Sequence, residues 1–103
     1  MSDIDLSGKV AIVTGGGRGM GRSMAIALAK AGAGVTIMVA REAAELEAVA
    51  QTIRDEAGAD HVHAIVADVT DEAACIRARD ETLEKFGGLH VLIHHAARGH
   101  KFI

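Results

Sequence analysis

The sequence has one cysteine, no proline and no long apolar run, and each of these absences excludes a class of protein. The single thiol, Cys75, rules out an internal disulfide framework and a cysteine-rich zinc site. No run approaches the roughly 20 apolar residues of a membrane span, and the acidic start carries no apolar stretch of signal-peptide length. Proline is absent beside 12 glycines, which indicates tight turns rather than a disordered linker. We therefore expect a soluble, cytoplasmic protein with no membrane partner.

The chain also lacks an excess of charge of one sign. It has 11 basic and 14 acidic residues, and its formal net charge is −3 when the histidines are neutral. These residues are mixed along the chain and form no basic stripe, so nucleic acid is not an expected partner. A hydrophobic content of 50% allows a buried core, and the length predicts one small domain over residues 1–103.

Four short apolar runs rich in β-branched residues predict strands. These runs cover residues 10–13, 35–39, 62–66 and 91–93. Three stretches with helical signals lie between them and cover about residues 19–31, 42–57 and 71–86. The first two apolar runs have almost no polar residue, which is typical of parallel strands covered on both faces. The alternation β-α-β-α-β-α-β therefore predicts an α/β protein with a parallel sheet and right-handed crossovers.

Apolar spacing and end signals indicate how the helices are placed. The second stretch has apolar residues at the spacing of an amphipathic helix, namely Leu46, Val49, Ala50, Ile53 and Ala57. The third is expected to begin after Thr70 or Asp71 as its N-cap. Its predicted buried side consists of Ala73, Ile76, Leu83 and Phe86. The glycines expected to end the three helices are Gly32, Gly58 and Gly87.

A glycine-rich turn, Thr14-Gly15-Gly16-Gly17-Arg18-Gly19-Met20-Gly21, joins the first strand directly to the first helix. Glycines let the backbone approach a phosphate closely, and the free amide groups and the helix dipole favour an anion there. A dinucleotide pyrophosphate suits such a turn, and a β-α turn without a ligand is the alternative. The spacing G-x-G-x-x-G is absent. The pair Gly17-x-Gly19 could begin it, but Arg22 stands where the third glycine would fall. The pattern present is T-G-x-x-x-G-x-G.

With this longer spacing the sequence resembles the short-chain dehydrogenase/reductase family, and the lead-in at residues 6–13 is also typical of its members. The resemblance extends from about Leu6 to Ala97, the first half of the family's fold. It implies a partial Rossmann-like doubly wound sheet in strand order 3-2-1-4. It also implies an NAD(P)-dependent oxidoreductase that acts on an alcohol or carbonyl substrate. The turn residues expected to bind the cofactor are Gly15, Gly17, Arg18, Gly19, Met20 and Gly21.

The end of the second strand bears on the choice of cofactor. No acidic residue occupies its last positions, where one would bind the ribose 2′-hydroxyl of NAD(H). Arg41 stands there instead, and its planar guanidinium suits the 2′-phosphate of NADP(H). Arg18 can approach the same phosphate from the other side. We expect NADP(H) to be preferred; in the alternative, Arg41 is solvated and Glu42 binds the ribose of NAD(H).

The resemblance also implies contacts after the third and fourth strands. Asp68 and Val69 are expected to border the adenine ring, and the alternative is that Asp68 caps the next helix. The fourth strand leads into His94-His95-Ala96-Ala97, where the family has Asn-Asn-Ala-Gly. His94 therefore takes the place of a cofactor-ribose contact, and Ala96 is retained as a cofactor-binding residue. An imidazole cannot copy an amide, which donates and accepts from adjacent atoms.

The histidines of the fourth strand raise the question of a metal site. His90 and His94 can share a face, but no carboxylate or cysteine is spaced to complete the ligand set. Adjacent residues of a strand point to opposite faces, so His94 and His95 cannot easily share one ion. We expect no metal.

The chemistry of the family depends on a serine and a Tyr-x-x-x-Lys segment, and the sequence contains no tyrosine. No catalytic residue can be named, so whether the chain is itself an enzyme stays open. We expect the cofactor-binding portion of a short-chain dehydrogenase/reductase, an incomplete domain able to self-associate through its exposed sheet edge. One alternative is a stand-alone nucleotide-binding or interaction module that pairs with a partner chain. Another is a methyltransferase that binds an adenosyl cofactor, which the turn spacing and Arg41 disfavour.

Overall fold

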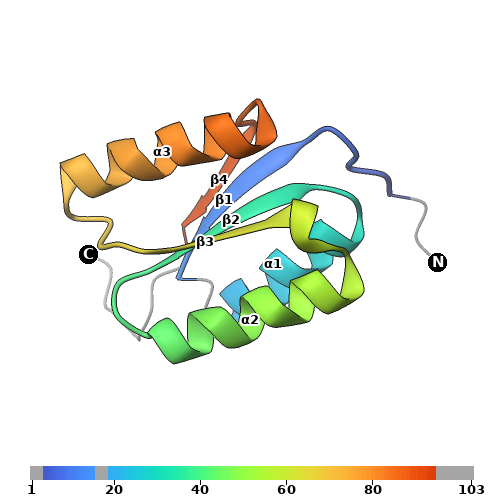
Figure 1. Ribbon diagram of the computed structural model, residues 1–103, viewed down its shortest axis with the longest axis horizontal. Coiled ribbons are helices and arrows are strands. Elements are labelled where there is room, and N and C mark those ends of the chain that lie inside the picture. Colours follow the sequence, from blue (N-terminus) through green and yellow to red (C-terminus); the bar gives the residue numbers. More distant parts are fainter. Residues whose placement is uncertain (1–3, 16–18, 95–103) are drawn as a thin grey trace, which may run out of the picture.

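The computed structural model describes residues 4–15 and 19–94, which alternate between strands and helices along the chain. The elements, in chain order, are β1 (Val10–Thr14), α1 (Gly19–Lys30), β2 (Gly34–Val39), α2 (Ala43–Glu56), the short helix η1 (Ala59–His61), β3 (Val62–Val66), α3 (Glu72–Phe86) and β4 (Val91–His94). The strands are parallel and lie in the order β3-β2-β1-β4 (Figure 1). The predicted α/β class, the partial Rossmann-like doubly wound sheet and its strand order are confirmed.

The helices lie on both sides of the sheet. α1 and α2 cover one face, and α3 lies on the other (Figure 1). The chain steps from β1 to β2 to β3 in one direction and then returns past β1 to reach β4. Because crossovers between parallel strands are right-handed, a step in the reverse direction places its helix on the opposite face. The connection through α3 therefore creates a switch point between β1 and β4.

The core has one layer on each face of the sheet. The larger layer, against α1 and α2, contains Val13, Ala25, Ala29, Ala33, Val35, Ile37, Val39, Leu46, Val49, Ala50, Ile53 and Val62. The smaller layer, against α3, contains Ile12, Met38, Ile65, Ala67, Ala74 and Ala78. β1 and β2 are buried along their whole length, as their nearly continuous apolar runs predict for strands covered on both faces.

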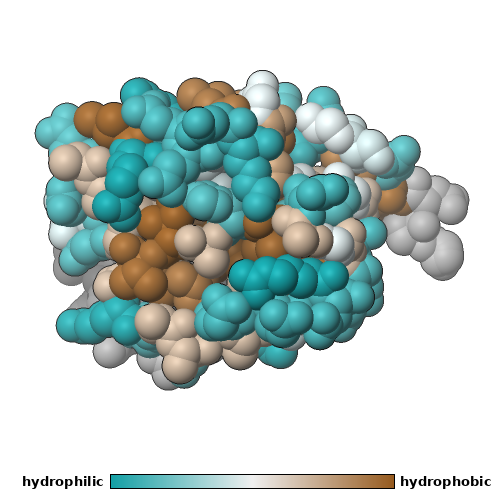
Figure 2. Space-filling model, viewed as in Figure 1, coloured by the Kyte–Doolittle hydropathy of each residue, from teal (hydrophilic) through white to brown (hydrophobic). Residues whose placement is uncertain are grey.

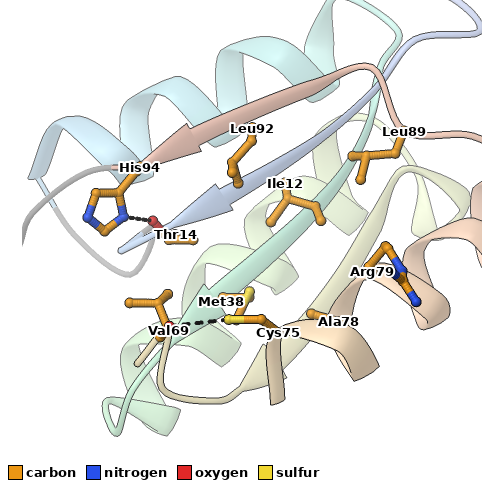
Figure 3. A pocket seen from close by; sticks show the side chains of 10 residues that line it. All are labelled: Ile12, Thr14, Met38, Val69, Cys75, Ala78, Arg79, Leu89, Leu92 and His94. Atoms are coloured by element: carbon orange, nitrogen blue, oxygen red, sulfur yellow. Dashed lines mark hydrogen bonds between the residues drawn. The ribbon is translucent and has the colours of Figure 1, made fainter. Parts of the chain in front are cut away.

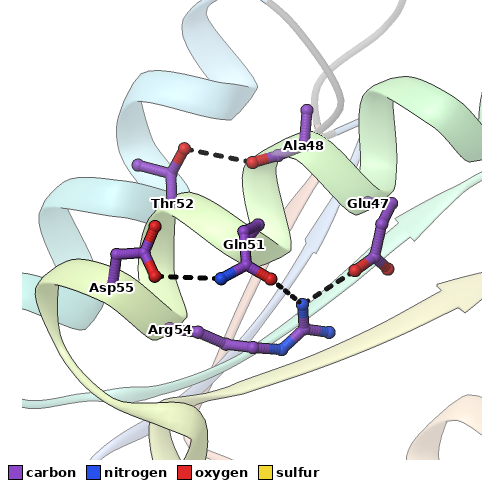
Figure 4. Close-up of polar contacts among 6 residues, drawn as sticks. All are labelled: Glu47, Ala48, Gln51, Thr52, Arg54 and Asp55. Carbon is purple, nitrogen blue, oxygen red and sulfur yellow. Dashed lines mark hydrogen bonds and ion pairs between the residues drawn. The ribbon is translucent and has the colours of Figure 1, made fainter.

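α2 is amphipathic in the way that its sequence predicts. Its buried residues are Leu46, Val49, Ala50 and Ile53. On the exposed side, Arg54 Nη1 lies 2.7 Å from Glu47 Oε2 and donates to Gln51 Oε1 at 3.0 Å (Figure 4). Exposed ion pairs of this kind contribute about 0–1 kcal/mol each, so the apolar side holds this helix in place.

The predicted buried side of α3 is wrong. The helix buries Ala74, Ala78 and Thr82. Of the residues predicted to be buried, Ile76 and Leu83 are 43% and 42% exposed, Ala73 is exposed and Phe86 is half-buried. The inner side of α3 carries small residues because the helix packs close to β2, and the larger aliphatic residues lie on its outer side. A prediction from apolar side-chain size therefore selects the opposite side.

The ends of α3 have distinct capping groups. Asp71 is the N-cap, and its Oδ1 accepts from Ala73 N at 3.0 Å and from Ala74 N at 3.3 Å. Of the two candidates, Asp71 is thus confirmed and Thr70 is not the cap. Gly87 follows the last turn with a φ of +81°, a left-handed conformation that glycine adopts without strain. Its amide donates to Leu83 O at 2.8 Å, so the predicted stop at this glycine is confirmed.

The surface of the molecule is mixed in polarity. Figure 2 shows an apolar strip between α2 and α3, where β3 forms one edge of the sheet. Val66 of β3 is 45% exposed. At the other edge, Val91 and Leu92 of β4 are 46% and 67% exposed. None of the helices formed by residues 4–15 and 19–94 is long and apolar enough to cross a membrane.

Candidate dinucleotide-binding site

The register of the strands brings their carboxyl ends to one edge of the sheet. Thr14 of β1 pairs with Met38 of β2 and with His94 of β4. Val39 pairs with Val66 of β3. Ligands of open α/β sheets bind outside the carboxyl ends of the strands, at the switch point of the topology. Here that point lies between β1 and β4, next to Thr14 and His94.

Most of the predicted cofactor-binding residues lie at this edge. Those within the described residues are Gly15, Gly19, Met20, Gly21, Arg41, Asp68, Val69 and His94. The remaining three, Gly17, Arg18 and Ala96, lie outside the described residues. The edge therefore brings together segments from four parts of the chain, each following or ending a different strand.

The glycine turn begins with a residue that needs glycine's conformational freedom. Gly15 has a φ of +73°, a left-handed conformation that side-chain-bearing residues adopt rarely. Its amide donates to Met38 O at 2.8 Å, so this amide continues the sheet and is not free for a phosphate. The next described residues, Gly19 and Met20, are exposed at the start of α1, whereas Gly21 is buried. The first amides of a helix have no partner within the helix, and no acidic residue in the first turn of α1 offsets its positive end.

Asp68 follows β3, and its carboxylate is held by a local turn. Its Oδ1 accepts from the amide and the hydroxyl of Thr70, both at 2.9 Å. These two bonds hold the pKa of Asp68 below its ordinary value of 3.8, and the nearby Arg41 guanidinium lowers this pKa further. The carboxylate is therefore ionised at neutral pH. Among the described residues, the hydrogen bonds of this carboxylate go to Oδ1 alone, and none of these residues donates to Oδ2.

Asp68 does not cap α3, which is the alternative role that the sequence allowed for it. That role belongs to Asp71, three residues later. Thr70, a cap candidate in the sequence, instead orients the Asp68 carboxylate. The spacing Asp-x-Thr is a known signal for such side-chain-to-backbone turns, so this contact was predictable in principle.

Arg41 lies between β2 and α2 and is exposed. Within residues 4–15 and 19–94, no carboxylate forms an ion pair with its guanidinium, although Asp68 lies near enough to interact electrostatically. Neighbouring Glu42 is the N-cap residue of α2, and its side chain makes no capping bond. A guanidinium next to a carboxylate can bind a ligand that carries both a phosphate and an amino group, because each charge forms strong hydrogen bonds to one of these groups.

The switch point itself is marked by a contact that the sequence does not indicate. His94 Nδ1 lies 2.7 Å from Thr14 Oγ1 (Figure 3). Thr14 is 5% exposed, whereas His94 is exposed. A hollow of about 400 Å³ opens beside them on the α3 side of the sheet, with mainly apolar walls. It is lined by Ile12, Thr14, Met38, Val69, Cys75, Ala78, Arg79, Leu89, Leu92 and His94.

His90, His63 and Cys75 have structural contacts elsewhere. His90 Nδ1 accepts from Val10 N at 3.0 Å, at the opposite end of β4 from His94. His63 Nε2 lies 2.8 Å from Glu81 Oε1, between β3 and α3. The Cys75 thiol donates to Val69 O at 3.3 Å. Nowhere in the described part of the chain do three His, Cys, Asp or Glu side chains come together as metal ligands.

Known proteins are similar to this chain both in sequence and in fold. The family model of short chain dehydrogenases matches residues 9–102. The 11-beta-hydroxysteroid dehydrogenase of Pinus massoniana is 38% identical over 99 residues, which span 96% of this chain and 27% of that protein. The apo-form of glucose dehydrogenase from Caenorhabditis elegans is similar with a TM-score of 0.83 and 39% identity, over 91% of this chain and 40% of that one.

A third similar protein is a short-chain dehydrogenase/reductase from Burkholderia phymatum, solved in complex with NAD. Its TM-score is 0.77 and its identity is 32%, over 89% of this chain and 31% of that one. The chain thus spans between 27% and 40% of the length of these relatives. The family match covers nearly the whole sequence, and the strand order and glycine turn agree with it. This chain belongs to the short-chain dehydrogenase family.

Proposed function

We propose that this chain binds a nicotinamide dinucleotide at the carboxyl edge of its sheet and prefers NADP(H) to NAD(H). The proposal depends on one observation: Arg41 and Asp68 lie near each other at the carboxyl ends of the strands. The first helix, α1, also begins at this edge of the sheet. Family membership supports a dinucleotide ligand, and the Burkholderia phymatum relative was solved with NAD. The preference for the phosphorylated form rests on Arg41.

Each group of residues has a proposed role toward a part of the cofactor. The turn residues Gly15, Gly17, Gly19, Met20 and Gly21 surround the pyrophosphate, where unpaired helix amides favour an anion. Arg41, with Arg18, binds the 2′-phosphate through charge-assisted bonds. Asp68 accepts from the adenine amino group while Val69 lies against the ring. His94 and Ala96 lie against the ribose.

The proposed chemistry is divided between this segment and residues that it does not contain. A bound nicotinamide supplies hydride transfer to or from an alcohol or carbonyl substrate. The residues of this chain bind and orient that cofactor. Because the sequence has no tyrosine, we propose that it contributes cofactor binding alone and that proton transfer requires further polypeptide.

A fluorescence titration of the 103-residue chain with NADPH and with NADH tests this proposal directly. Tighter binding of NADPH is the expected result, because the 2′-phosphate adds two negative oxygens for the Arg41 guanidinium. Equal affinity, or tighter NADH, would refute the cofactor preference. A folded chain that binds no adenine dinucleotide would refute the proposed function.

A second candidate function is association with another chain through β4. The observation that favours it is the exposure of Val91 and Leu92 on an edge strand whose outer backbone groups can pair with a further strand. Light scattering after gel filtration distinguishes a monomer from a dimer. A dimer that Leu92→Lys converts to a monomer supports association, and a monomeric wild-type chain contradicts it.

A further inference from the structure

We propose that Thr70 is a positioning residue of the dinucleotide site, which fixes the Asp68 carboxylate so that the site selects a 6-amino purine over a 6-oxo purine. The inference rests on the proposed function, in which Asp68 accepts from the adenine amino group, and it names the residue that gives this contact its selectivity. Thr70 acts through Asp68 and needs no contact of its own with the cofactor.

The backbone on either side of Asp68 is held by the sheet and by α3. Ala67 N donates to Val39 O at 2.8 Å, which extends the pairing of β2 and β3 by one residue. Asp71 N donates to Asp68 O at 3.0 Å, and Asp71 is itself fixed as the N-cap of α3. Asp68 therefore leaves the sheet at a defined point, and the freedom that remains is the rotation of its side chain.

Thr70 limits this rotation with two donors. Its amide and its hydroxyl both donate to Asp68 Oδ1 at 2.9 Å. A backbone amide can donate but cannot accept, so it requires an oxygen at this place. Among the described residues no other group donates to the carboxylate, and the nearby Arg41 acts on it only electrostatically. Oδ1 is thus turned toward Thr70, and Oδ2 is the atom left for a ligand.

The chemistry of this second atom decides which purine fits. The bonds from Thr70 hold the pKa of Asp68 below its ordinary value of 3.8, and an ionised carboxylate accepts but cannot donate. The 6-amino group of adenine is a donor, so it pairs with Oδ2. Hypoxanthine has a 6-oxo acceptor there and carries its proton on the adjacent ring nitrogen. Only a carboxylate that is able to turn could follow that proton.

The same turn predicts the result of exchanging a single atom. In Asp68→Asn, the side-chain oxygen has to face the two Thr70 donors, so the amide nitrogen takes the place of Oδ2. That nitrogen donates, and it suits the 6-oxo group of hypoxanthine instead of the 6-amino group of adenine. The base preference should therefore reverse. A side chain that rotates without restraint would offer either its oxygen or its nitrogen and would show no preference.

Fluorescence titration of the 103-residue chain with NADPH and with its hypoxanthine analogue, reduced nicotinamide hypoxanthine dinucleotide phosphate, tests the inference. Both probes carry the same dihydronicotinamide and 2′-phosphate and differ only in the purine. We expect the wild type to bind NADPH about tenfold more tightly, the factor for one hydrogen bond to a charged group. Thr70→Val keeps the side-chain shape without the hydroxyl and should lower this ratio about threefold. Thr70→Ser should restore it.

The variants at Asp68 and in a matched turn complete the experiment. Asp68→Asn should bind the hypoxanthine analogue more tightly than NADPH. Ser7→Ala removes the equivalent hydroxyl bond to Asp5 and should leave the wild-type ratio unchanged. If Thr70→Val does not fold by circular dichroism, Thr70→Ala takes its place.

Three results overturn the inference while leaving dinucleotide binding intact. They are a wild type that binds both probes equally, a ratio that loss of the Thr70 hydroxyl does not change, and an Asp68→Asn variant without a preference for the hypoxanthine analogue. A folded chain that binds neither NADPH nor NADH overturns the proposed function, and this inference with it.

Discussion

The hydroxyl oxygens of Thr36 and Thr82 lie 2.7 Å apart in the interior and join the middle of the sheet to α3. Both residues are 0% exposed. Thr82 Oγ1 also donates to Ala78 O at 2.7 Å. Because Thr82 has a single hydroxyl proton, which goes to that carbonyl, Thr36 is the donor in the pair. Thr36 therefore needs Thr82 as the acceptor of its proton, whereas Thr82 also has Ala78 O as a partner.

This asymmetry predicts different costs for two isosteric substitutions. Thr82→Val leaves the buried Thr36 hydroxyl without an acceptor and should lower the free energy of unfolding by about 1–3 kcal/mol. Thr36→Val leaves Thr82 bonded to Ala78 and should cost less, about 0.5–1.5 kcal/mol. Urea unfolding followed by circular dichroism measures both. The double variant should cost less than the sum of the single variants; a larger cost for Thr36→Val than for Thr82→Val contradicts the assignment of the donor.

Close packing of α3 on the sheet gives a second prediction. A Cβ atom on Gly34 would lie 2.5 Å from Cδ1 and 2.9 Å from Cγ of Phe86. We expect Gly34→Ala to lower the free energy of unfolding by about 1–3 kcal/mol, as overpacked cores do. In a Phe86→Ala background the added methyl group meets no ring, so Gly34→Ala should cost much less there. An equal cost in both backgrounds, measured by the same unfolding experiment, argues against this clash.

The turn at Asp68 predicts a specific pH dependence. Thr70 holds the pKa of Asp68 below 3.8, so the stabilisation from this turn is present above the ordinary pKa and is lost as pH falls through the lowered one. Thr70→Ala removes the hydroxyl bond and should move the carboxyl titration of Asp68 up toward 3.8. Carbon-13 NMR of the side-chain carboxyl follows this titration.

The chain contains a matched control for the same experiment. Asp5 Oδ1 accepts from the amide and hydroxyl of Ser7 at 2.9 and 2.6 Å, and these bonds lower the pKa of Asp5. Ser7→Ala should raise the titration of Asp5 and leave Asp68 unchanged. If Thr70→Ala leaves the Asp68 titration where it was, the hydroxyl does not contribute.

The proposed cofactor preference predicts a selective loss of affinity. Arg41→Ala should weaken NADPH binding about tenfold to hundredfold, the range for one hydrogen-bonded charge contact. NADH affinity should change by no more than about threefold, because NADH has no 2′-phosphate for this side chain to bind. Arg77→Ala, an exposed arginine on α3 that pairs with Glu81, should leave both affinities unchanged. Equal losses for NADPH and NADH after Arg41→Ala contradict a role at the 2′-phosphate.

Much of the fold could be predicted because its signals are local. The apolar runs that form β1 and β2 identify buried parallel strands without reference to any partner. The spacing of Leu46, Val49 and Ile53 identifies the inner side of α2. The end of α3 at Gly87 likewise follows from a residue type that suits a left-handed cap.

The inner side of α3 could not be found in this way. Its buried residues are small or polar, and Thr82 is buried because Thr36 of β2 faces it. Thr36 and Thr82 are 46 residues apart along the chain. Two exposed aliphatic residues, Ile76 and Leu83, give the misleading periodicity.

The sequence alone determined the order of strands and helices, the glycine turn and the residue types available at the strand ends. Only the tertiary structure decided which of these residues meet. Thr14 and His94 are 80 residues apart, and it is the parallel register of β1 and β4 that brings their side chains into contact. The strand order likewise brings Asp68 near Arg41. Such contacts depend on the pairing of strands that lie far apart in the sequence, so no short stretch of the sequence contains both partners.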